Sequence, residues 1–403
     1  MIKFESINKA VCILIAWLCF FSPLSQNGVV ISTKMTILLW GLLLIALALN
    51  MYTCGVKNIQ LVISGFIIAY LLCATLVIAV GDEFEFSFAR LVPVLCANII
   101  CIIHYKKISD VKFLIRLFDF IIVTLFFVNI LIFVHNAWII KWISNNYTQY
   151  FPNITEYHLS IMKPLGLFGV HNQAAFIYCG LYIISNILYQ YTRAIRYPIY
   201  MIVLLLLNIL LRSTTSLGFA AVMLGIFVYT NRKSKPLMFL SVCIVSVVVL
   251  LFLQSKIFGD YLETLSNGVN GFFPRYVEGL NGLYKNNIEI VKQFLLGIGF
   301  TIPQNNTIYF ADSGYLIFYT MGNIVFAITF YILFLKSLCY EIKSKEYRLF
   351  FALYVLLMEL GFVSFLALKT ICFYWLMYIY IKSFENEQGK IYDRAKKYKF
   401  KIN

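Results

Sequence analysis

The chain has 403 residues, of which 61% are apolar and only 13% are charged. An ordinary globular chain has about 45–50% apolar and about 25% charged residues, and the mean hydropathy of this chain is +0.83. Because so few charges cannot cover a water-exposed surface, the composition excludes a soluble domain, a disordered chain and a disulfide-rich secreted protein. The 33 basic residues exceed the 18 acidic ones, and this net charge of +15 raises the question of membrane sidedness.

Apolar stretches long enough to cross a membrane recur along the chain. A helix needs about 20 apolar residues to cross the hydrocarbon core of a bilayer. The sequence predicts ten to twelve spans, and therefore an all-α polytopic membrane protein with a single integral membrane domain over 1–403. The candidate spans are 8–25, 35–53, 59–80, 88–105, 114–136, 170–190, 198–212, 216–230, 236–254, 314–335, 349–368 and 370–382. The first resembles a signal peptide, but no small-residue cleavage site follows it, so we expect an uncleaved first helix.

Basic residues concentrate in every second connection between the spans. With the N-terminus in the cytoplasm, 23 basic residues fall on the inner side and 10 on the outer side. The positive-inside rule therefore predicts that both termini are cytoplasmic and that 383–403 is a basic cytoplasmic tail. Topology then accounts for most of the net charge, so nucleic acid is not needed as a partner, and membrane lipids are the expected surroundings.

Two connections are much longer than the others, and both are predicted on the outer side. They cover 137–169 and 255–313, and long loops in a compact protein are usually functional. The first is rich in aromatic residues and amides, which favours either an aromatic belt at the membrane interface or a surface on which sugar rings stack. The sequence contains no phosphate-binding glycine loop and no zinc-ligand spacing, so we expect neither a cofactor nor a metal.

The end of the first long loop carries a cation and a histidine. In KPLGLFGVHNQAAF, which begins at Lys163, two glycines allow a tight backbone turn and His171 stands at the start of the next span. Lys163 would lie at lipid-headgroup depth, either as a phosphate ligand or as a snorkelling anchor. His171 is a candidate general base, although a hydrogen-bonded interfacial histidine is the commoner role.

A polar turn, RSTTSLG, separates the seventh and eighth candidate spans and begins at Arg212. Arg212 would stand at an outer helix end beside serine and threonine hydroxyls, where its guanidinium could hold a phosphate. The turn also leaves open that the two spans form one broken re-entrant element.

The second long loop predicts an amphipathic helix on the outer membrane surface. After Pro274 the apolar positions recur every three or four residues, which is the period of a helix with one apolar face. Arg275 and Glu278 lie on its first turn, as a surface ion pair or as a pyrophosphate-binding site centred on the guanidinium. Asp312 ends the loop and precedes a span, so it either caps that span or acts as a catalytic base.

Two further acidic features compete with these sites. Asp82, Glu83 and Glu85 follow the third span and could ligate a divalent cation, although exposed acids in a short loop are usually only solvated. Glu359 lies near the middle of the eleventh span. A carboxylate inside a membrane is a functional candidate, and the other interpretation is a hydrogen-bonded structural role.

The order of the outer motifs resembles a known family. A cation precedes G-x-F-G-x-H-N and small residues, a serine and threonine turn follows, then an arginine on a loop helix, and finally DSGYL before a span. This order resembles the O-antigen polymerase (Wzy-type) family, within the O-antigen ligase-like bacterial membrane glycosyltransferases. The resemblance covers roughly residues 160–335.

The resemblance implies an enzyme of the bacterial inner membrane with a site facing the periplasm. Its fold would be GT-C-like, with about twelve transmembrane helices and two large periplasmic loops that contain amphipathic helices. It would join oligosaccharide repeat units, carried on undecaprenyl pyrophosphate, into a surface polysaccharide by a metal-independent and inverting transfer. A polysaccharide chain-length regulator is a further partner that the family suggests.

Particular residues take roles under this resemblance. The pyrophosphate would be held by cations near headgroup depth, and the acceptor hydroxyl would need a base or a positioning group. The candidates for substrate binding are Lys163, Arg275, Arg212, Asn172 and Tyr315. The candidates for acid–base chemistry are Asp312, Glu278 and His171, in that order. Relatives often have arginine where this chain has Lys163, and sibling ligases have a histidine where it has Asp312 and Ser313, which favours polymerase over ligase.

Two alternatives remain. One is an O-antigen ligase or another polyprenyl-linked sugar transferase, including a metal-dependent one that would use the acidic cluster at 82–85. The other is a lipid-linked oligosaccharide flippase or transporter, which would explain Glu359 and the helix count. A transporter would not need the 59 residues of the second long loop, and the sequence shows no clear internal repeat.

Overall fold

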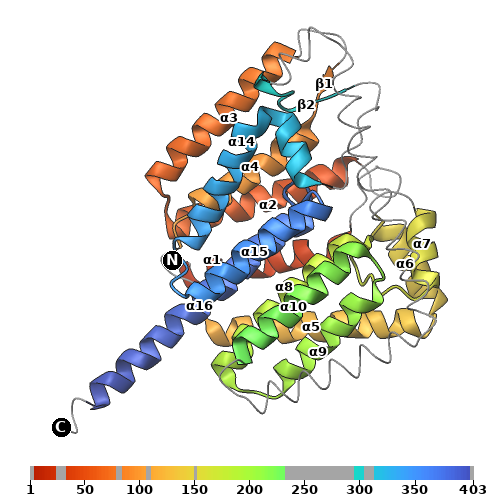
Figure 1. The fold of residues 1–403 in the computed structure, drawn as a ribbon, viewed down its shortest axis with the longest axis vertical. Coiled ribbons are helices and arrows are strands. Elements are labelled where there is room, and N and C mark those ends of the chain that lie inside the picture. Colours follow the sequence, from red (N-terminus) through yellow and green to blue (C-terminus); the bar gives the residue numbers. More distant parts are fainter. Residues whose placement is uncertain are drawn as a thin grey trace.

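The computed structural model describes residues 4–23, 33–78, 84–105, 110–148, 152–231, 295–303 and 313–399. Almost all regular structure within these residues is helical (Figure 1). Arg275, Glu278 and Asp312 lie outside the described residues, as do the predicted ninth span and the predicted helix after Pro274.

The first helices coincide with predicted apolar stretches. They are α1 (Phe4–Ala16), the π-helical turn η1 (Trp17–Phe21), α2 (Thr33–Cys54), α3 (Asn58–Ile78), α4 (Phe88–Ile102) and α5 (Val111–Phe133). The first predicted span is therefore not one regular α-helix. It changes to π-helical hydrogen bonding at Trp17, and the helical structure ends where the Ser22 hydroxyl donates to the Leu18 carbonyl (2.6 Å).

The first long loop contains two short helices, α6 (Ala137–Asn146) and α7 (Pro152–Ser160). The Asn136 side chain caps α6 by accepting from the Ile139 N–H (3.1 Å), as expected of asparagine at a helix start. α6 is amphipathic, because it buries Ile139 and Ile143 on one face and exposes Trp138 on the other. In Figure 1 the two helices lie together at the right-hand side of the molecule.

Three helices follow, α8 (His171–Thr192), α9 (Arg196–Leu210) and α10 (Thr214–Asn231). α9 and α10 are two separate helices joined by a short turn, and their arrangement as two spans or as one broken re-entrant element stays a prediction. α10 runs back along α8, where the Asn186 amide donates to the Thr230 hydroxyl (3.1 Å). The chain reverses between α9 and α10 over three residues, with Arg212 at a positive φ of 51°.

The C-terminal part comprises α14 (Gly314–Cys339), α15 (Lys345–Gly361), the 3-10 turn η2 (Ser364–Leu366) and α16 (Leu368–Lys399). α14 is kinked where Gly322 and Asn323 leave helical geometry. α15 ends at Gly361, earlier than the predicted span end at 368. α16 continues without a break to Lys399. The backbone therefore stays helical across residue 383, where the tail was predicted to start.

A two-stranded antiparallel sheet joins distant segments next to these helices. β1 (Phe84–Phe86) pairs with β2 (Thr301–Pro303), with Phe84 opposite Pro303. The Arg90 guanidinium donates to the Thr301 carbonyl (2.8 Å). The strands therefore fix the segment that leads toward α14 against the start of α4.

Among the described residues, four helices are long and apolar enough to cross a membrane: Met35–Cys54, Asn58–Ile78, Val111–Phe133 and Gly314–Cys339. Phe88–Ile102, Arg196–Leu210 and Thr215–Thr230 are shorter apolar helices. Within the described ranges the chain is thus an all-α membrane protein, apart from the small sheet. The full number of spans and the side that each end faces stay predictions.

Contacts between distant segments gather at two ends of the helical bundle. At one, here called the Glu341 end, the Glu341 carboxylate pairs with Lys57 (2.7 Å) and His104 (3.2 Å). At the other, here called the loop end, the Tyr147 hydroxyl donates to the Phe21 carbonyl (2.9 Å). The connections at the Glu341 end are those that the charge pattern predicts on the inner side of the membrane. The connections at the loop end are those that it predicts on the outer side.

The core that supports the loop end lies between α8, α15 and α16. The Phe176 ring stacks on the Tyr354 ring, with centroids 4.5 Å apart. A Cβ atom at Gly180 would come within 2.0 Å of the Phe373 ring. Because α8 approaches α16 this closely, the start of α8 is held against the turn between α15 and α16.

Candidate anion-binding site

The loop between α7 and α8 carries the first cation of the site, Lys163. Its shape depends on two glycines with left-handed φ, Gly166 (55°) and Gly169 (72°), a region that favours glycine. The Tyr178 hydroxyl donates to the Pro164 carbonyl (2.7 Å) and the Thr155 hydroxyl to the Gly169 carbonyl (3.2 Å). The loop carbonyls are therefore held by side chains of neighbouring helices.

Lys163 itself is buried, with only 8% of its surface exposed. Burial and the nearby Arg212 guanidinium lower the pKa of the Lys163 ammonium from 10.5 to about 8, because both disfavour the charged form. No hydrogen bond or ion pair of this ammonium occurs within the described ranges. Lys163 is thus a buried cation without a described counter-charge.

Two histidines lie beside this ammonium. The rings of His158, from α7, and His171, from α8, meet edge to face with centroids 5.6 Å apart. Burial and the Lys163 charge lower the pKa of His158 to about 4, so His158 is neutral at pH 7. His171 also interacts electrostatically with the positive charge of Lys163. Its Nδ1 atom is buried without a partner among the described residues.

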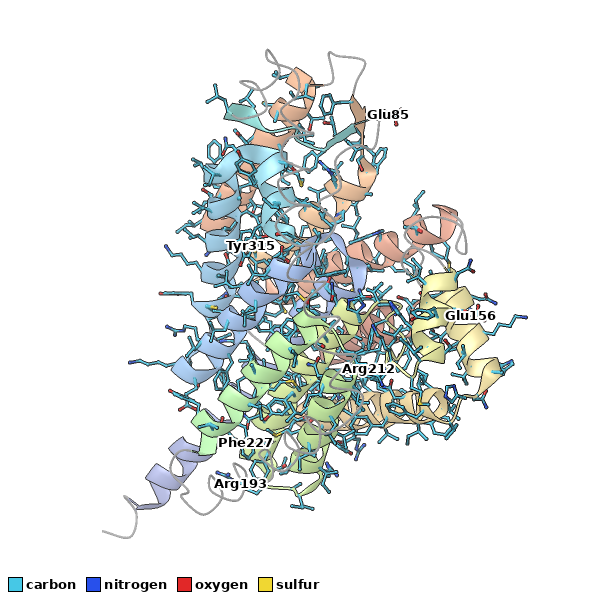
Figure 2. The ribbon with its side chains drawn as sticks, turned by 45° about the vertical axis from the view of Figure 1, so that its right-hand side comes forward. Glu85, Glu156, Arg193, Arg212, Phe227 and Tyr315 are labelled. Atoms are coloured by element: carbon cyan, nitrogen blue, oxygen red, sulfur yellow. The ribbon has the colours of Figure 1, made fainter. Side chains whose placement is uncertain are left out.

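Arg212 supplies the second cation, at the turn between α9 and α10. Figure 2 shows Arg212 at the opposite end of α9 from Arg193, on the side of the molecule that also carries Glu156 of α7. Its left-handed backbone is rare for arginine, and its buried Nε atom has no partner in the described part of the chain. Two reciprocal hydrogen bonds fix the start of α10. The Ser213 N–H donates to the Ser216 hydroxyl, and the Ser216 N–H donates to the Ser213 hydroxyl (both 3.1 Å).

The start of α8 adds a third electropositive element. The residue before it is Val170, whose side chain cannot accept a hydrogen bond, and no side chain caps this end. An uncapped helix start presents N–H groups and the positive end of the helix dipole. Together with Lys163 and Arg212, it forms the kind of site that binds phosphate groups.

Cations at the Glu341 end are arranged differently. There Lys9 pairs with Glu5 (3.1 Å) and Asp110 (3.6 Å), and Arg196 pairs with Asp119 (3.0 Å). All salt bridges found in the described ranges lie at this end. Lys163 and Arg212 at the loop end have no carboxylate partner within the described ranges, as expected of cations that could bind an anion.

The other candidates from sequence have separate places. The Asn172 amide donates to the Gly361 carbonyl (2.9 Å), while its own carbonyl oxygen is buried without a described partner. Asn172 thus ties α8 to the end of α15 and keeps one free acceptor beside the site. The Tyr315 hydroxyl donates to the Leu356 carbonyl (2.6 Å), so it is engaged between α14 and α15 rather than with Lys163.

Glu359 has a defined structural environment and is completely buried. Its carboxylate accepts from the Tyr331 hydroxyl (2.6 Å), the Ser364 N–H (3.0 Å) and the Ser364 hydroxyl. It also lies against the first residue of α14, because a Cβ atom at Gly314 would be 1.6 Å from Oε2. These donors satisfy the carboxylate, which supports a structural role for Glu359 over a coupling site for transport.

Sequence reasoning missed two residues at the loop end. His158 lies in the last turn of α7, five positions before Lys163, and no local feature of the sequence marks it. Lys369 follows η2, and its ammonium donates to the Leu167 carbonyl (2.7 Å) in the loop that carries Lys163. No group of three or more His, Cys, Asp or Glu side chains suited to a metal occurs in the described ranges.

Comparisons with known proteins do not identify a family. No protein-family model, no curated protein and no solved structure matches the chain.

Proposed function

We propose that this protein polymerises oligosaccharide repeat units, carried on undecaprenyl pyrophosphate, at the periplasmic face of a bacterial inner membrane. The observation that carries the proposal is the pair Lys163 and Arg212, one buried and one half-buried cation without a described carboxylate partner beside an uncapped helix start. A lipid pyrophosphate presents two phosphates at headgroup depth, and such a group needs cations where its charge develops. The order of the sequence motifs supplies the rest of the argument.

In the proposed reaction, a sugar hydroxyl of one repeat unit attacks the anomeric carbon of another. A carbon–oxygen bond to the sugar forms, the bond to the pyrophosphate breaks, and undecaprenyl pyrophosphate leaves. Lys163, Arg212 and the start of α8 would stabilise the negative charge that grows on the leaving group. The hydroxyl proton would pass to a carboxylate, for which Asp312 remains the first candidate from sequence.

His158 and His171 fit this chemistry as neutral neighbours of the cations. A neutral imidazole adds a donor or an acceptor without repelling Lys163. The Nδ1 atom of His171 and the carbonyl oxygen of Asn172, neither of which has a partner among the described residues, both belong to the first residues of α8. We propose that they contact the sugar or phosphate oxygens of the substrate.

The proposal is tested in cells whose surface polysaccharide depends on this chain. Lys163→Ala and Arg212→Ala should each remove the long polymer from a polysaccharide ladder gel while the protein still inserts. Accumulation of single lipid-linked repeat units on the periplasmic side would support a polymerase, whereas accumulation on the cytoplasmic side would support the flippase alternative. Polymer that forms but is not transferred to its final acceptor would support the ligase alternative.

A further inference from the structure

The turn that joins α15 to α16 carries a buried cation of its own. Lys369 is only 1% exposed and has no ion pair in the described ranges. Its ammonium donates to the Leu167 carbonyl (2.7 Å) and lies over the rings of Tyr147 (4.7 Å) and Phe168 (5.5 Å). A buried ammonium is costly unless it is compensated, and here a carbonyl and two aromatic faces compensate it.

The contacts of Lys369 converge on the loop that carries Lys163. Leu167 and Phe168 belong to that loop, and the Leu167 carbonyl lies between the two left-handed glycines. No hydrogen bond within the loop is made to this carbonyl among the described residues, so Lys369 is what fixes it. The titratable groups around Lys369 are the thiols of Cys19 and Cys372 and the ring of Tyr147.

Glu359 in turn holds the segment that presents Lys369. Its carboxylate binds the N–H and hydroxyl of Ser364, and the Thr370 hydroxyl donates to the Ser364 and Ala367 carbonyls. The end of α15 is tied to α8 through the bond from Asn172 to Gly361 (2.9 Å). The turn over 361–370 therefore connects the start of α14, the start of α8 and the loop of Lys163.

We infer that Lys369 is a positioning residue, which holds the loop over 163–170 so that Lys163 faces the anion site. The inference rests on the proposed function for the identity of the anion, a pyrophosphate group. The positioning itself rests only on the contacts of Lys369 with Leu167, Phe168 and Tyr147. A substitution at Lys369 should therefore loosen the loop over 163–170 directly, and should weaken anion binding only as a consequence.

Hydrogen exchange of the purified full-length chain in detergent tests the positioning. Lys369→Met should raise exchange in the peptide over 163–170 by about tenfold or more, because the loop loses an anchor. Lys369→Gln, which keeps one donor for the Leu167 carbonyl, should raise it less. Lys57→Met is the matched control, because Lys57 is also a mostly buried lysine that donates to a carbonyl, that of Ser337 (2.9 Å), and it should leave this peptide unchanged.

Binding of inorganic pyrophosphate to the same variants tests the link to the anion site. Lys369→Met should weaken binding by about tenfold or more, as expected when a ligating group is misplaced. Unchanged exchange over 163–170 in Lys369→Met, or an equal rise at the Glu341 end, would overturn the positioning role. If the unmodified chain binds no pyrophosphate, the proposed function fails at this site, while the exchange result still decides the role of Lys369.

Discussion

The Arg212 guanidinium lies close enough to the Lys163 ammonium to lower its pKa, although the two residues come from different turns of the chain. Two like charges near each other in a partly buried position repel, and this arrangement is costly without an anion between or beside them. The described salt bridges all lie at the other end of the bundle. The relationship between Lys163 and Arg212 is therefore the main structural reason to expect an anionic ligand at the loop end.

Removing either cation should reduce the transfer rate strongly. Lys163→Ala and Arg212→Ala are each expected to lower the turnover number by about 100-fold or more, the size of effect seen when one stabilising donor is lost. Lys141→Ala is the matched control, because Lys141 is an exposed lysine of α6 that is also predicted on the outer side. Normal chain lengths on a ladder gel from both cation variants would refute the site assignment.

The pH dependence of anion binding should report on Lys163. Its pKa of about 8 means that the ammonium is charged below pH 8 and becomes neutral as the pH rises through that value. Anion affinity should therefore be highest below pH 8 and fall between about pH 7.5 and 9, whereas an ordinary lysine would keep its charge there. Pyrophosphate binding measured from about pH 6.5 to 9.5 checks the shape of this curve.

Lys163→Arg is the control for this pH effect. An arginine stays charged throughout the range, so the decline around pH 8 should disappear while binding itself persists. His158 contributes no charge change there, since its pKa is about 4. An unchanged decline in Lys163→Arg would assign the titration to another group.

The contact between Gly314 and Glu359 makes a prediction about stability. Gly314→Ala places a Cβ atom 1.6 Å from Oε2 of Glu359, and the carboxylate cannot move away without losing Tyr331 and Ser364. The expected cost is about 2–3 kcal/mol, in the upper range for overpacking. Gly225→Ala is the control, because a Cβ atom there has nothing within 4 Å and alanine favours the helix.

A double variant separates this clash from a general effect. Glu359→Ala removes the side chain that Gly314→Ala would strike, so the two losses of unfolding free energy should sum to more than the loss of the double variant. Thermal unfolding of the four proteins in detergent measures the coupling. Fully additive losses would show that Gly314 and Glu359 do not interact as described.

Most of the described helices follow from hydropathy, because an apolar run of spanning length in a chain of this composition almost always forms a helix. Hydropathy does not give the exact helix ends. α15 ends at Gly361 and the Glu359 carboxylate accepts from Ser364 just beyond the helix end, and nothing in the local hydropathy marks that bond. A polar turn alone likewise does not decide whether α9 and α10 are separate helices.

The two cations of the candidate site were predictable from the sequence, but their neighbours and their arrangement were not. Lys163 and Arg212 stand out in the sequence as cations on the less basic side, and the structure brings them together. His158 and Lys369 do not stand out, because their roles arise only when α7 and the start of α16 meet the loop over 163–170. Tyr315 belongs to a sequence motif, yet its hydroxyl serves the contact between α14 and α15.

The most direct measurement is a reconstituted reaction. The purified full-length chain in proteoliposomes is supplied with undecaprenyl-pyrophosphate-linked oligosaccharide, with and without a metal chelator. We predict polymer of two or more repeat units, one released undecaprenyl pyrophosphate for each new linkage, and no effect of the chelator. Movement of the intact lipid-linked substrate across the vesicle membrane without any new linkage would contradict the proposed polymerase.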